Sequence, residues 1–87
     1  MPEKDEFAEA QARVKKLSRR PSNDQLLELY GLYKQATDGD AKGSRPGILD
    51  PKGRAKFDAW TARRGTAPAE AKRRYVSLVA TLVKTLG

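Results

Sequence analysis

Two tyrosines and a lysine lie close together in the segment LLELYGLYKQAT, which spans residues 26–37. Side chains four residues apart are neighbours on a helix, so Tyr30 and Lys34 would project from the same rim, with Tyr33 nearby. A phenol ring and an ammonium group in that arrangement can stack on a planar ring and bind an anion at the same time. The alternative is an ordinary amphipathic core helix whose lysine extends past the apolar face into solvent.

The same segment has the period of a helix. Its apolar residues recur at three- and four-residue spacing and form one stripe, made of Leu26, Leu29 or Tyr30, Tyr33 and Ala36. Ser22 followed by Gln25 forms a capping box, which predicts a helix from Ser22 to about Asp38. Gly31 inside this helix costs roughly 1 kcal/mol relative to alanine. A close approach by a ligand or another backbone would explain it, and so would packing.

Three further helices are expected, and no segment alternates at the period of a β-strand. The first runs from about Lys4 to Leu17, with Phe7, Ala10, Val14 and Leu17 on its apolar face. The third begins at Asp50, before Pro51, and runs to about Arg64, with Ala59 and Trp60 on its buried side. The fourth is capped by Thr66 and continues to the C-terminus. These helices must pack on one another to bury their faces, which predicts one all-α domain over residues 1–87.

The composition excludes several kinds of site. The 87 residues contain neither cysteine nor histidine, which removes Cys/His zinc sites, thiol nucleophiles and histidine acid–base chemistry. Asp38, Asp40 and Gly43 match part of a calcium-binding loop, but Lys42 and Leu49 occupy two of its ligand positions, so we reject calcium. We therefore expect no metal and no cofactor. No apolar run approaches the length of a membrane span and no secretory leader is recognisable, so a cytoplasmic protein is expected.

The charge of the chain is uneven. Residues 1–40 contain seven Lys/Arg and eight Asp/Glu, whereas residues 41–87 contain eleven Lys/Arg and three Asp/Glu, for a formal net charge of +7. A basic C-terminal half indicates an anionic partner, which could be a nucleic acid, a lipid surface or a phosphorylated small molecule. A solvated surface that happens to be basic has the same pattern.

A series of longer motifs narrows the choice. LYGLYKQAT is followed by a loop with RPG, then by DPKGRAKFDAW, and then by RG with a tyrosine ten residues beyond that glycine. In this order and at this spacing the motifs resemble the acyl-CoA-binding protein family, and the resemblance runs from Phe7 to about Leu82. It implies a four-helix bundle with an up-down-down-up path and a bowl that holds an acyl-CoA ester.

The resemblance also implies roles for single residues. Tyr33 matches the ring that stacks on adenine, and Tyr30 and Lys34 match residues close to the ribose 3′-phosphate. Lys56 would contact that phosphate as well, and Tyr75 would lie against the ligand near its adenine end. The looser matches are Lys15 and Lys52 for ligand contact in some members, and Ala10, Leu26 and Leu27 for the path of the acyl chain.

Two residues depart from the family pattern. Phe57 stands where most members have tryptophan, and Gln11 stands where a small apolar residue is usual. Either could loosen the packing or alter the fit of the acyl chain, but neither is at a phosphate contact.

The resemblance implies a monomeric carrier and buffer of long-chain acyl-CoA, with no specific nucleic acid. Acyl-CoA-using enzymes are candidate further partners, and the basic charge adds a transient contact with an anionic membrane surface as another candidate. The main alternative is a small basic nucleic-acid-binding protein that would read bases with the third helix, through Lys52, Arg54 and Lys56. An enzyme acting on acyl-CoA is a weaker alternative, because no motif places a pair of acid–base residues.

Overall fold

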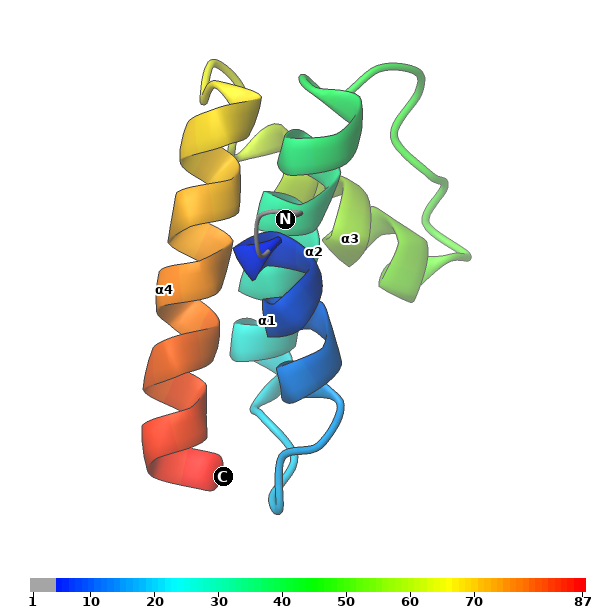
Figure 1. Ribbon diagram of the computed structural model, residues 1–87. Coiled ribbons are helices and arrows are strands. Elements are labelled where there is room, and N and C mark those ends of the chain that lie inside the picture. The colour runs from blue at the N-terminus through cyan, green and yellow to red at the C-terminus, as the bar shows by residue number, and fades with distance from the viewer. Residues whose placement is uncertain (1–4) are drawn as a thin grey trace.

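The computed structural model describes residues 5–87 and contains four helices in that range: α1 (Glu6–Val14), α2 (Asn23–Asp38), α3 (Pro51–Thr61) and α4 (Pro68–Leu86). In Figure 1, α1 and α4 descend while α2 and α3 rise, which is the expected up-down-down-up path. α2 packs against α4 and α3, and α1 packs against α4. The prediction of an all-α bundle is confirmed.

α1 is shorter than predicted. It ends at Val14 instead of Leu17, and the expected start at Lys4 lies outside the described residues. The Lys16 amide bonds to the Arg13 carbonyl at 3.0 Å, a short-range bond that ends the helix, and the Arg19 amide then bonds to the Leu86 carbonyl of α4 at 3.1 Å. The chain therefore leaves α1 early because it is tied to the end of α4.

The start and end of α2 agree with the prediction. Ser22 accepts from the Gln25 amide at 3.1 Å, and Gln25 Oε1 accepts from the Ser22 amide at 2.8 Å, which completes the capping box. The apolar stripe differs, however, because Leu32 is 1% exposed while Tyr33 is 37% exposed. The helix turns a different face to its partners than the spacing suggested, and the Tyr33 ring is left at the surface.

Gly31 is explained by packing. It is buried, and a Cβ atom added to it would lie 2.9 Å from the carbonyl carbon of Ala59 on α3. A side chain at this position would push the two helix backbones apart. Of the alternatives left open by the sequence, close approach of another backbone is the one the structure supports.

The predicted ends of the last two helices need correction. α3 ends at Thr61, not Arg64, because Arg63 and Arg64 continue as tight turns, with amides bonded to the Trp60 and Thr61 carbonyls at 3.0 Å each. Thr66 does not cap α4, whose N-cap is Ala67 without a side-chain hydrogen bond. The Thr66 carbonyl instead accepts from Gln35 Nε2 at 2.7 Å. At the start of α3 the prediction is confirmed, since Asp50 Oδ1 accepts from the Gly53 amide at 3.0 Å.

The core lies between α1, α2 and α4. Its buried residues are Ala10, Leu29, Leu32, Tyr75, Val79 and Leu82. No residue of α3 is buried, and Ala59 and Trp60, expected on its buried side, are half-buried. Trp60 Nε1 donates to the Gly39 carbonyl at 2.7 Å, so one edge of the ring holds the loop after α2. α3 is thus an outer helix supported by α2, and a cleft remains between the two.

Candidate functional site

Three aromatic rings from three helices meet beside α2. The Tyr33 ring lies 6.0 Å from the Phe7 ring at an interplanar angle of 23°, and the Tyr75 ring lies 5.1 Å from Phe7 edge to face. Tyr75 is 5% exposed, so it supports the group from within the core, while Tyr33 presents ring surface to solvent. Burial, and then the neighbouring Tyr33, raise the pKa of Tyr75 above its ordinary 10.0, so this phenol stays neutral.

The aromatic cleft, of about 330 Å³, opens next to these rings. Its lining combines aliphatic and aromatic side chains with one cation and is made of Val14, Lys15, Pro21, Leu26, Leu29, Tyr30, Tyr33 and Tyr75. Of the residues predicted for the site, it brings together all three tyrosines, Lys15 and Leu26. Tyr33 and Lys15 are exposed, so a ligand can reach both from solvent.

The α2–α3 cleft, of about 470 Å³, lies between the first turns of α2 and α3. It is lined by Arg20, Asn23, Leu26, Leu27, Pro51, Lys52, Ala55 and Lys56. Leu26 lines both clefts, so they meet at this residue. One cleft holds all three tyrosines among aliphatic side chains, and the other is aliphatic with a basic rim. Together they form an elongated site that suits a ligand with unlike ends.

Lys56 connects the two clefts. Its Nζ lies 5.5 Å from the centroid of the Tyr30 ring, so α3 places an ammonium group over an aromatic face of α2. Lys52, one turn earlier on α3, is exposed at the rim of the same cleft. The short distance between α2 and α3 at Gly31 is what allows Lys56 to reach Tyr30.

Lys34 is placed differently from the other predicted lysines. Its ammonium group forms an ion pair with Asp38 one turn later and lies 4.8 Å from the Trp60 ring centroid. The hydrogen bond to Asp38 raises the pKa of Lys34 above its ordinary value and lowers that of Asp38. Lys34 is not among the residues that line either cleft, so an incoming anion would have to draw it away from Asp38.

Ala10 is also apart from both clefts. It is 3% exposed in the core and contributes to a separate pocket between α1 and Val76 of α4. Three residues at the clefts were not predicted as part of the site: Phe7 as a partner of Tyr33, and Arg20 and Asn23 at the α2–α3 cleft. Phe7 stood out only as a core residue. Arg20 lies in a loop, where no helical spacing indicates what it faces.

The two departures from the family pattern are accommodated locally. Gln11 is half-buried and its Nε2 donates to the Phe7 carbonyl one turn earlier at 3.4 Å. Phe57 is half-buried and packs edge-on against Trp60, with ring centroids 6.4 Å apart. Phe57 therefore keeps an aromatic contact with another residue of α3.

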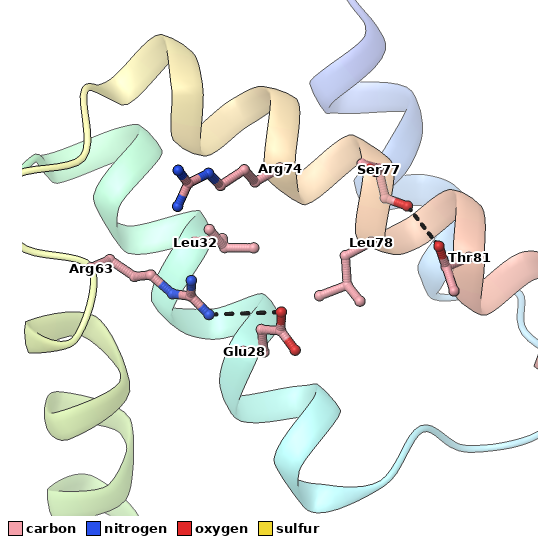
Figure 2. A pocket seen from close by; sticks show the side chains of 7 residues that line it. All are labelled: Glu28, Leu32, Arg63, Arg74, Ser77, Leu78 and Thr81. Atoms are coloured by element: carbon pink, nitrogen blue, oxygen red, sulfur yellow. Dashed lines mark hydrogen bonds and ion pairs between the residues drawn. The ribbon is translucent and has the colours of Figure 1, made fainter.

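A further pocket, of about 260 Å³, lies on another face of α2, toward α4. It is lined by Glu28, Leu32, Arg63, Arg74, Ser77, Leu78 and Thr81. Figure 2 shows the guanidinium groups of Arg63 and Arg74 on either side of Leu32, and Arg63 is 3.7 Å from Glu28. None of the residues predicted to bind ligand is in this lining.

Known proteins match this chain over most of its length. The family described as "Acyl CoA binding protein" matches residues 4–79. The chain belongs to the acyl-CoA-binding protein family. The acyl-CoA-binding protein of Dictyostelium discoideum is 50% identical over 72 residues, which is 83% of this chain and 86% of the relative. The homologue of Manduca sexta is 45% identical over 84 residues, covering 95% of this chain and 93% of the relative.

The fold agrees with that of the family. The crystal structure of acyl-CoA-binding protein 2 of Oryza sativa is similar, with a TM-score of 0.88 at 44% identity, covering 92% of this chain and 87% of that one.

The part of the chain that the structure describes holds no cluster of three or more side chains suited to a metal ion. Within the same residues, no helix is both long and apolar enough to cross a membrane.

Proposed function

We propose that this chain binds long-chain fatty acyl-CoA esters and acts as a carrier and buffer of the intracellular acyl-CoA pool. The observation that carries the proposal is the meeting of two unlike clefts at Leu26. An acyl-CoA ester is itself divided in this way, with a purine and phosphates at one end and an aliphatic chain at the other. Membership of the acyl-CoA-binding protein family supports this assignment.

The head group of the ester is assigned to the basic and aromatic residues. Tyr33 would stack on the adenine, since its ring is accessible, and Tyr30, Lys34 and Lys56 would surround the 3′-phosphate. Tyr75 would support the stacked rings from behind. Lysine–phosphate contacts are charge-assisted and therefore among the stronger hydrogen bonds, and stacking of a base on an aromatic side chain contributes ~1–3 kcal/mol.

The acyl chain is assigned to the aliphatic walls, with Leu26 and Leu27 along its path and Lys15 and Lys52 at the edges. Each buried methylene contributes ~0.8 kcal/mol, so a dozen contribute on the order of 10 kcal/mol, against association costs of ~4–15 kcal/mol. The acyl chain should therefore dominate affinity while the head group sets specificity. Covering the chain also keeps a micelle-forming amphiphile in solution, which is what a carrier requires.

We further infer that the protein is a cytoplasmic monomer that needs no cofactor and does not transform its ligand. The family is one of binding proteins, and no motif places acid–base residues at the clefts. Acyl-CoA-using enzymes would receive the ligand. The relatives reported above are acyl-CoA-binding proteins, so the nucleic-acid-binding alternative gains no support.

Isothermal titration calorimetry with palmitoyl-CoA, free CoA and palmitate tests the proposal. Palmitoyl-CoA should bind far more tightly than either part, because each part satisfies only one end of the site. Equal affinity for palmitate and its CoA ester would overturn the proposal. Incubation with palmitoyl-CoA, followed by a free-thiol assay, tests the absence of hydrolysis, and steady release of CoA would reveal an enzyme.

A further inference from the structure

The loop between α2 and α3 ends in a turn with an unusual tip. The Asp50 amide bonds to the Gly47 carbonyl at 3.0 Å, which leaves Ile48 and Leu49 at the two central positions of the turn. Ile48 is 79% exposed and Leu49 is 96% exposed. Turn tips normally carry Gly, Asn, Asp, Pro or Ser. Among the described residues, Tyr33, at 37%, is the one other large hydrophobic residue that is exposed.

This Ile48–Leu49 tip is held in a fixed place. Arg45, three residues before it, makes two hydrogen bonds to the Asp58 carboxylate of α3, at 2.9 and 2.7 Å. Asp50, directly after the tip, caps α3. Figure 1 shows this loop on the side of the molecule away from α4. The two aliphatic side chains thus project from a braced loop and take no part in the core.

The charges around the tip are positive. Asp50 is engaged in capping and Asp58 is neutralised by Arg45. Lys52 and Arg54 lie in the first turn of α3, directly after the tip, and within residues 5–87 neither side chain makes a hydrogen bond or ion pair. Exposed aliphatic side chains beside uncommitted cations are the combination that binds an anionic lipid surface, because the apolar groups enter the headgroup region while the cations contact the lipid charges.

The tip also stands at the entrance of the α2–α3 cleft. Pro51 and Lys52, which follow Asp50, line that cleft together with Leu26 and Leu27. We propose that the Ile48–Leu49 tip docks this protein on anionic membrane surfaces and turns the mouth of the α2–α3 cleft toward the bilayer. This inference rests on the proposed function. An acyl chain leaving the bilayer would then enter the cleft with little exposure to water.

Sedimentation with vesicles of phosphatidylcholine and roughly one third phosphatidylserine tests the docking. The wild type should bind, and Ile48→Ser with Leu49→Ser should reduce binding on the order of tenfold or more, since both apolar anchors are lost. Arg54→Gln, which removes one charge beside the tip, should reduce it about fivefold. Arg73→Gln is the matched control, because it removes the same charge from α4, and it should have a much smaller effect.

Two further measurements separate this inference from the proposed function. Palmitoyl-CoA affinity in solution should be the same for the tip variant and the wild type, while transfer of palmitoyl-CoA from preloaded vesicles should be slower for the variant.

Unchanged vesicle binding by the tip variant, or no vesicle binding by the wild type, overturns the docking and leaves the carrier function standing. Equal losses in the two charge variants would assign vesicle binding to summed charge and overturn it too. Wild-type self-association that the tip substitutions abolish would assign the tip to a second copy. Failure of the wild type to bind palmitoyl-CoA in solution would instead overturn the proposed function.

Discussion

The ammonium group of Lys56 on α3 lies over the ring of Tyr30 on α2, with Nζ 5.5 Å from the ring centroid. Tyr30 lines the aromatic cleft and Lys56 lines the α2–α3 cleft, so this contact joins the two halves of the site. A phosphate bound beside Tyr30 would meet a cation whose position is already set by the ring.

Replacement of Lys56 by alanine should weaken the binding of palmitoyl-CoA by roughly 1.5–3 kcal/mol, the range for a hydrogen bond to a charged group. The palmitoyl ester of dephospho-CoA lacks the 3′-phosphate, so the substitution should matter much less with that ligand. Calorimetry on both esters measures the difference, with Lys84→Ala on the last turn of α4 as the control. An equal loss of affinity with the dephospho ester would show that Lys56 does not contact the 3′-phosphate.

Gly31 fixes the separation of the helices that makes this contact possible. In Gly31→Ala the new methyl group would meet the Ala59 carbonyl, and overpacking of this kind costs about 1–3 kcal/mol. The gain in helix propensity, about 1 kcal/mol, offsets only part of the cost. We expect lower unfolding free energy in urea and weaker palmitoyl-CoA binding, because α3 carries Lys56. Gly47→Ala is the control, since a Cβ there has nothing within 4 Å. A Gly31→Ala protein as stable as wild type would show that α3 can shift freely.

The parts of the fold that the sequence predicted well depend on local signals. Ser22 with Gln25 and Asp50 with Pro51 each place a helix start through bonds within a few residues. The early end of α1 depends on a bond between Arg19 and Leu86, which are far apart in the chain, so no local pattern could reveal it.

The candidate site divides in the same way. Helical spacing predicted that Tyr30 and Lys34 share a face of α2. It could not show that the Lys34 ammonium group forms an ion pair with Asp38 and lies over the Trp60 ring. The contact between Tyr30 and Lys56 depends on the close approach of α2 and α3 at Gly31. This approach is a feature of the tertiary packing, which no local sequence pattern shows. Individual residue roles were carried by the family resemblance, and they stay predictions until ligand binding is measured.

The ion pair between Lys34 and Asp38 should compete with the ligand. If Lys34 contacts the 3′-phosphate, Asp38→Asn would release its ammonium group and remove a repelling carboxylate. We expect palmitoyl-CoA to bind roughly two- to fivefold more tightly, in keeping with the small value of an exposed ion pair. The gain should be smaller with the dephospho ester. Weaker binding by Asp38→Asn would mean that the pair positions Lys34 for the ligand.

Asp40 should make the stability of the fold sensitive to acid. Its Oδ1 accepts from the Gly65 amide at 2.9 Å and from Gln35 Nε2 at 2.8 Å, and these bonds lower its pKa below the ordinary 3.8. A lowered pKa means that this stabilisation is fully present above about pH 4 and is lost as the pH falls through the folded-state value. Urea unfolding at a series of pH values should show this decline, and Asp40→Asn, which does not titrate, should decline less. An identical pH profile for the two proteins would show that Asp40 contributes nothing to it.

The arginines near α4 should be dispensable for ligand affinity. Arg73 and Arg74 both bond to Glu70, and Arg63 lies by Glu28 in the pocket of Figure 2, outside both clefts. Changing these three arginines to glutamine removes three positive charges, yet charges beyond about 10 Å are largely screened at ordinary salt. Palmitoyl-CoA affinity by calorimetry should therefore change little. The association rate in stopped flow should fall modestly, because electrostatic steering is reduced. If affinity collapsed while circular dichroism showed an intact fold, the ligand would have to lie between α2 and α4, and the two clefts that meet at Leu26 would not be its site.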